Sequence, residues 1–140
     1  MKQKTQNIKK ILVLSLSFLL FIALSSCGRV KGVWEDNIHL ARKSVTFNAR
    51  GDSIIISTLG SWWWITDIGM DSTYYYHFKN IDQSKDYYSI KENGIVVGRR
   101  GRRGLFIKAG ANPHHVQRII SVGLEAGDYF DRVIITQLGK

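Results

Sequence analysis

Short apolar or alternating segments, separated by turn-forming residues, dominate the chain from residue 33 onward. Residues 44–49 (SVTFNA) alternate in polarity, and residues 52–59 (DSIIISTL) are rich in β-branched side chains, as strands are. No window of ten or more residues shows an apolar stripe with a 3.6-residue period, so we expect helices only as short connectors. The pattern predicts an all-β sandwich or barrel. The other predicted strands are residues 62–68, 73–78, 86–90, 105–109, 117–124 and 131–137.

The N-terminal 27 residues have the pattern of an export signal. Four lysines and no acidic residue precede the unbroken apolar run ILVLSLSFLLFIAL, residues 11–24. The following LSSC resembles the lipobox of bacterial lipoproteins, in which the signal is removed before a cysteine that is then lipidated. Cys27 is the only cysteine of the chain, so no disulfide framework is expected. The alternatives are an ordinary signal peptide, or a transmembrane anchor with a chance cysteine.

Lipidation at Cys27 would hold the protein on a membrane through acyl chains. A glycine after the cysteine, here Gly28, is typical of lipoproteins that are sent to the outer membrane. The sequence does not indicate whether the domain would lie on the cell surface or on the periplasmic face of that membrane. The predicted organisation is a signal peptide at residues 1–27, a tether at residues 28–39 and one β-sandwich domain at residues 40–140.

One basic segment stands out in the mature chain. The formal net charge of +9 includes four signal-peptide lysines, and GRRGRRG, residues 98–104, supplies four of the remaining charges. Arginine forks suit phosphate, sulfate and carboxylate groups, so the segment is a candidate anion-binding loop formed by Arg99, Arg100, Arg102 and Arg103. The alternative is a solvated hairpin loop whose charges discourage edge pairing. Nucleic acid is not an expected partner.

The C-terminal third shows a recognisable pattern. Asn112 precedes a turn, Arg118 opens an alternating strand, Gly127 lies in the next turn, and the last strand ends on Gln137. Together with Trp64 followed by isoleucine, this resembles the BACON domain, an immunoglobulin-like, antiparallel β-sandwich module of Bacteroidetes lipoproteins and polysaccharide-degrading enzymes. The resemblance covers about residues 40–140. It implies carbohydrate or mucin binding, with a spacer role as the competitor, and it supplies no ligand residues.

The sequence offers no catalytic or metal-binding constellation. Its only cysteine is the predicted lipidation site, and the adjacent His114 and His115 would point to opposite sides of a strand. Carboxylates for glycoside hydrolysis need only be close in space, but a small sandwich without a deep cleft is expected to be non-catalytic. We therefore expect neither an enzyme, nor a metal, nor a cofactor.

The aromatic side chains are the candidate ligand platform. A strand places alternate residues on opposite faces. With Trp64 in the core, as the resemblance implies, Trp62 also faces inward and Trp63 points outward. By the same alternation Tyr76, Phe78, Tyr88 and Ile90 would fill the core with Trp64, and Tyr74 shares the face of Tyr76 and Phe78. The outward set, Trp63, Tyr75 and Tyr87, could stack on sugar rings of a polysaccharide or mucin glycan. Alternatively the N-terminal segment around Trp34 or a loop covers them, and the protein is a structural or protein-interaction module with an envelope protein partner.

Overall fold

The computed structural model of the chain describes residues 35–140. Signal peptide, Cys27, Gly28 and Trp34 lie outside these residues. Within the described range no helix is long and apolar enough to cross a membrane. The described chain forms nine strands: β1 (Ser44–Phe47), β2 (Asp52–Ser57), β3 (Trp64–Met70), β4 (Thr73–Tyr76), β5 (Tyr87–Glu92), β6 (Ile95–Arg100), β7 (Gly104–Ala109), β8 (Arg118–Ala126) and β9 (Tyr129–Gln137).

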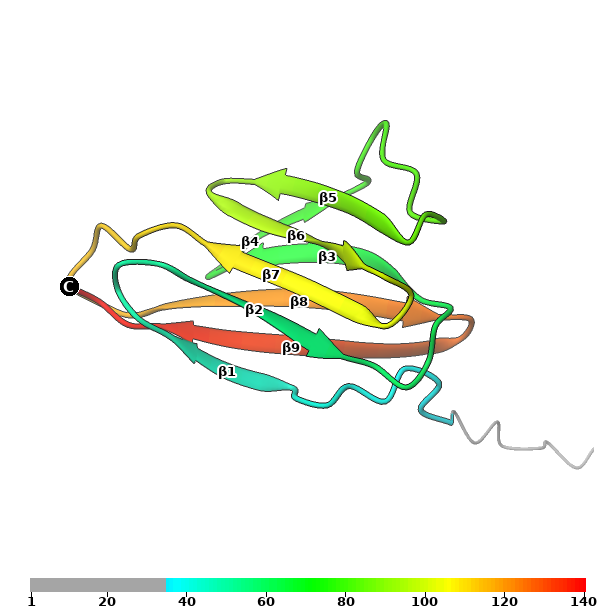
Figure 1. Cartoon of the computed structure of the whole chain (residues 1–140). Helices are drawn as coiled ribbons and strands as arrows, with labels where there is room; N and C mark the ends of the chain where they lie inside the picture. The colour runs from blue at the N-terminus through cyan, green and yellow to red at the C-terminus, as the bar shows by residue number, and fades with distance from the viewer. Residues whose placement is uncertain (1–34) are drawn as a thin grey trace, which may run out of the picture. The chain divides into compact units, whose positions relative to one another are not determined.

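The strands form two sheets that pack face to face. One sheet has the order β1-β9-β8-β3-β4, and the other has the order β2-β7-β6-β5 (Figure 1). Neighbouring strands are antiparallel except β1, which pairs in parallel with β9. These two sheets confirm the predicted all-β sandwich.

The core lies between the sheets and consists mainly of isoleucine, valine and leucine side chains, which suit a pleated, buried surface, together with Phe47 and Trp63. It extends to the segment before β1, because Ile38 is fully buried and the Asp36 carboxylate accepts hydrogen bonds from the amides of Ile38 and His39 at 3.0 and 2.7 Å. The packed domain therefore begins before residue 40, the boundary predicted from the sequence. The buried apolar residues of β3, β7, β8 and β9 are Ile65, Ile68, Leu105, Ile107, Ala109, Ile120, Val122, Leu124, Ala126, Val133 and Ile135.

A bulge in β3 reverses the predicted faces of the tryptophans. Ile65 pairs with Leu124 and Asp67 pairs with Gly123, which leaves Thr66 as an extra residue. An extra residue interrupts the two-residue alternation of a strand. Strict alternation, counted back from the buried Ile68, would direct Trp64 and Trp62 to the core. Because of the extra residue, Ile65 and Trp63 face the core instead. Trp63 is 2% exposed and Trp62 is 75% exposed, so the prediction that Trp63 points outward is wrong.

The faces of β4 are also the reverse of the prediction. Tyr75 pairs with the fully buried Ile68, so it lies on the core side and is half-buried. Tyr74 and Tyr76 lie on the outer face of the five-stranded sheet, where they are exposed and their rings stack with centroids 6.2 Å apart. In β5 the prediction is confirmed, because Ile90 is buried and Tyr87 is 71% exposed.

The segment GRRGRRG is mostly strand. Gly98, Arg99 and Arg100 belong to β6, Gly104 begins β7, and the turn consists of residues 101–103. Arg99 pairs with Leu105 and faces the core, whereas Arg100 faces outward. The prediction of a loop over residues 98–104 is therefore wrong.

Candidate functional site

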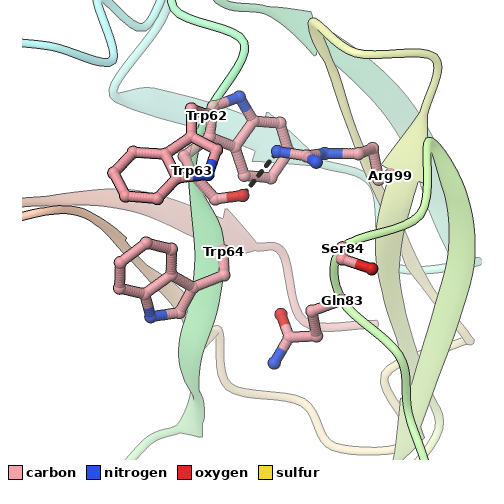
Figure 2. A pocket seen from close by; sticks show the side chains of 6 residues that line it. All are labelled: Trp62, Trp63, Trp64, Gln83, Ser84 and Arg99. Carbon is pink, nitrogen blue, oxygen red and sulfur yellow. Dashed lines mark hydrogen bonds between the residues drawn. The ribbon is translucent and has the colours of Figure 1, made fainter.

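A cleft of about 300 Å³ opens beside the start of β3, where the chain segment that precedes the strand approaches the four-stranded sheet. Its lining comes from the segment leading into β3, the first residue of β3, the β4–β5 loop (residues 77–86) and β6 (Figure 2). We call it the tryptophan cleft. Its lining residues are Trp62, Trp63, Trp64, Gln83, Ser84 and Arg99.

Trp63 is the buried part of this cleft. Its Nε1–H donates a hydrogen bond to Oγ1 of the buried Thr58 at 3.0 Å. The guanidinium of Arg99 lies over its ring, 4.2 Å from the ring centroid, within cation–π distance. The Trp63 side chain thus joins the hydrophobic core to the cleft and offers little surface to a ligand.

Trp62 and Trp64 are the accessible aromatic groups. Trp62 is 75% exposed, and Trp64 is half-buried. Their rings meet edge to face, with centroids 5.8 Å apart and planes inclined by 78°. This is a favourable aromatic geometry, so the pair supports itself while most of the Trp62 side chain stays exposed.

Gln83 fixes the polar wall of the cleft. Its Nε2 donates to the carbonyl of Ile65 at 3.1 Å, and its Oε1 accepts from the amide of Ile65 at 2.8 Å. Since β4 ends at Tyr76, this side-chain amide continues the hydrogen-bond ladder along β3 where no strand remains. Oε1 also accepts from the Tyr88 hydroxyl at 3.1 Å, so the wall is tied to both sheets.

Ser84, beside Gln83, also has a defined orientation. Its hydroxyl and its amide both donate to the carboxylate of Asp82, and these hydrogen bonds lower the pKa of Asp82. The Ser84 oxygen keeps a lone pair for a ligand hydroxyl. Cleft polarity therefore comes from an ordered amide and an ordered hydroxyl beside an exposed indole.

Arg99 gives the cleft a buried positive charge. It is 4% exposed, and its Nη2 donates to the carbonyls of Trp63 and, at 3.4 Å, Ser61; Figure 2 shows the first of these bonds. Its Nε is buried and has no hydrogen-bond partner in the part of the chain that the structure describes. Burial raises the pKa of the neighbouring Tyr88 to about 12, although the charge of Arg99 acts in the opposite direction. Tyr88 is therefore neutral at physiological pH and provides no negative charge to pair with Arg99.

The structure does not bring the predicted sugar platform together. Trp63 is buried in the cleft, Tyr75 lies on the core side of β4, and Tyr87 is exposed on the outer face of the four-stranded sheet. Of these three, only Tyr87 has the predicted exposure. The open aromatic ring beside a cleft is instead Trp62, which the sequence interpretation assigned to the core.

The four predicted anion-binding arginines also separate. Arg99 is buried, and Arg100 is held by the carbonyl of Tyr88 at 2.9 Å and by stacking on Phe106, 4.6 Å from its ring centroid. Arg102 and Arg103 remain exposed in the turn, where Arg102 pairs with Asp86 at 3.4 Å. The structure therefore does not support one anion-binding loop of four arginines.

The residues that carry the sequence resemblance have structural roles. The Arg118 Nε donates to Oε1 of Gln137 at 2.8 Å, and the fully buried Gln137 donates to the carbonyls of Asn48 and Gly110. Asn112, also fully buried, donates to two carbonyls, those of Val116 and Leu138. These side chains replace missing backbone partners at one end of the sandwich, which is why they are polar and buried.

Sequence reasoning missed four residues of the cleft as site residues: Trp62, Trp64, Gln83 and Ser84. A bulge determines the exposure of Trp62, and Gln83 lies in an irregular loop whose path the local sequence does not reveal. Among residues 35–140, no three His, Cys, Asp or Glu side chains gather in a group that could hold a metal ion.

Comparisons with known proteins indicate the fold. No protein-family model matches the chain, and no curated protein matches it. Among solved structures, the chain is similar to the NMR structure of a protein from Bacteroides thetaiotaomicron, with a TM-score of 0.58 and 15% sequence identity. The match covers 79% of this chain and 93% of that chain. At this identity the likeness supports the sandwich fold and nothing about a ligand.

Proposed function

We propose that the protein is a non-catalytic, lipid-anchored module of the bacterial outer membrane that binds carbohydrate in the tryptophan cleft. The observation that carries the proposal is the exposure of Trp62, 75%, beside a cleft with an ordered amide and hydroxyl. An exposed flat indole can pack on the apolar face of a sugar ring, and the neighbouring polar groups can bond its hydroxyls. Pockets commonly combine an aromatic surface with a few fixed polar groups.

Two sequence features give this proposal its setting. The predicted lipidation of Cys27 would place the domain on a membrane surface, where extracellular or envelope glycans are available. The resemblance to the BACON domain implies carbohydrate or mucin binding. The ligand residues proposed here are Trp62, Trp64, Gln83 and Ser84, and no metal, cofactor or catalytic residue is part of the proposal.

A glycan array followed by affinity electrophoresis would test the proposal. The Trp62→Ala variant is expected to bind the best array ligand at least about tenfold more weakly, because a tryptophan at the centre of an interface commonly contributes about 2 kcal/mol or more. Tyr87→Ala is the matched control, since Tyr87 is equally exposed but lies outside the cleft. Absence of binding to every glycan, or equal losses in the two variants, would refute the proposal.

A protein-interaction or spacer module is the second candidate. It is favoured by the burial of Trp63, since this alternative explains the tryptophan as part of the core rather than as a ligand platform. It predicts that chemical cross-linking on intact cells captures an envelope protein, and that no glycan competes with the capture. If a glycan reduces the capture of the envelope protein, and the Trp62→Ala variant does not bind this glycan, the result would instead favour the carbohydrate-binding proposal.

A further inference from the structure

The charge of Arg99 has no counter-ion in the protein. No carboxylate of the described residues lies within 4.0 Å of its guanidinium, and residues 1–34 contain no aspartate or glutamate that could provide one. Arginine remains protonated in proteins, so this is a permanent positive charge on a side chain that is 4% exposed. Buried charges in proteins are normally paired, because their desolvation is unfavourable.

The protein compensates this charge only in part. Two backbone carbonyls accept from Nη2, and the ring of Trp63 faces the guanidinium. Within residues 35–140 the Nε–H finds no acceptor. Tyr88, which pairs with Arg99 across the sheet, stays neutral, so it adds no negative charge beside the guanidinium. The Nε–H, the Nη1 donors, for which no bond to residues 35–140 is found, and one full charge therefore remain for a partner from outside the chain.

Arg99 lies in the wall of the tryptophan cleft, and the other lining residues carry no charge. A neutral sugar would leave this electrostatic imbalance unchanged on binding, whereas an anionic group would neutralise it in a partly desolvated place, where charge-assisted hydrogen bonds are strongest. The side chain reaches from β6 toward the tryptophans, as Figure 2 shows, so the charge and the open indole of Trp62 lie at the same cleft.

We propose that the ligand of the tryptophan cleft is an acidic sugar, whose carboxylate or sulfate group pairs with Arg99 while its ring packs on Trp62. This inference rests on the carbohydrate-binding function proposed above and specifies its ligand class. Arg99 is the residue that determines specificity for charge, and Trp62 is the residue that binds the ring. The Nε of Arg99 is buried, so direct contact of a ligand with this atom requires a small movement of the surrounding side chains.

The competing explanation is that Arg99 only supports the fold through its bonds to the carbonyls of Trp63 and Ser61. The two roles differ in their effect on ligand preference. Arg99→Met removes the charge and also the donor to the carbonyls of Trp63 and Ser61, so some loss of stability is expected under either role. If Arg99 serves the ligand, Arg99→Met should lose the preference for acidic sugars, whereas a purely supporting Arg99 predicts that a folded Arg99→Met keeps the wild-type preference.

Matched pairs of sugars that differ in one acidic group provide the test: trigalacturonate and its methyl ester, sialyllactose and lactose, galactose sulfate and galactose. We expect isothermal titration of the wild-type protein to give at least about a tenfold higher affinity for the acidic member of one pair, as one charge-assisted hydrogen bond allows. In Arg99→Met this ratio should fall to near one. Arg103→Met removes the same charge from the exposed turn and should keep the wild-type ratio.

The outcomes separate the inference from the proposed function. Equal affinity for acidic and neutral members in the wild type, or a ratio unchanged in Arg99→Met, would overturn the inference while leaving carbohydrate binding intact. Binding to no sugar of the panel or of the glycan array would overturn both. The wild-type comparison decides the matter even if Arg99→Met does not fold, and Arg99→Lys, which keeps the charge, should retain part of the preference.

Discussion

Replacing Trp63 by alanine should be among the most destabilising single changes in this domain. The side chain is 2% exposed. A tryptophan buries on the order of 200 Å², which at about 25 cal/mol per Å² corresponds to about 5 kcal/mol. The hydrogen bond from Nε1 to Thr58 adds about 1 kcal/mol, and partial collapse of the cavity recovers some of the loss. We therefore expect Trp63→Ala to lower the free energy of unfolding by about 3–5 kcal/mol.

Urea denaturation followed by far-ultraviolet circular dichroism measures this loss without relying on tryptophan fluorescence. For a domain of this size the expected fall in melting temperature is roughly 12–20 °C. Trp62→Ala is the control, because it removes the same side chain from the surface and should change stability by no more than about 0.5 kcal/mol. A loss below about 1 kcal/mol for Trp63→Ala, or a larger loss for Trp62→Ala, would refute the assignment of faces around the β3 bulge.

Three further predictions concern other parts of the chain. Gly123→Ala should lower the free energy of unfolding by about 2–3 kcal/mol in urea denaturation. The added methyl group would collide with the carboxylate of Asp67, which lies over Gly123 and pairs with Arg132 at 2.8 Å. An unchanged denaturation midpoint would contradict this. Tyr88 should contribute stability that is present below pH 10 and decreases as pH rises to about 12, since its hydroxyl ionises first in the unfolded chain. Tyr88→Phe should therefore lose less stability than the wild type over that range, and equal pH dependence would count against the assignment. Cys27→Ala should abolish incorporation of labelled palmitate in cells, and continued labelling would exclude Cys27 as the lipidation site.

The strands were predictable because local chemistry determines them. β-Branched runs between turn residues predict β2 and β9, and both form over most of the predicted ranges. The strand β6 was missed because the glycines of GRRGRRG suggested turns. A side chain at Gly98 would clash with the carbonyl of Tyr88, so this glycine is needed for close strand pairing, whereas Gly101, with φ of 69°, does lie in a turn. Tertiary contact, which the local sequence does not contain, distinguishes these two uses of glycine.

The faces of the tryptophans depend on one residue. Thr66 has high strand propensity and carries no signal of a bulge, yet its insertion reverses the orientation of every residue before it relative to Ile68. The pairing of β3 with β8 determines where the extra residue is placed, because Leu124 and Val122 both require apolar partners on the core side. A wrong choice of face thus followed from a strand prediction that was correct for residues 64–68, although Trp62 and Trp63 precede β3. No reasoning confined to residues 62–68 could have detected it.

The bulge also explains why core and candidate site meet at Trp63. With Trp63 directed inward, its ring provides a face for the guanidinium of Arg99, and its carbonyl accepts from the same group. Arg99 is thereby held at the cleft by a residue whose first role is packing. Loss of binding in a Trp63 variant would accordingly report both unfolding and displacement of Arg99. Only Trp62, which is exposed, and Arg99, whose removal leaves the apolar packing in place, can separate ring binding from charge recognition.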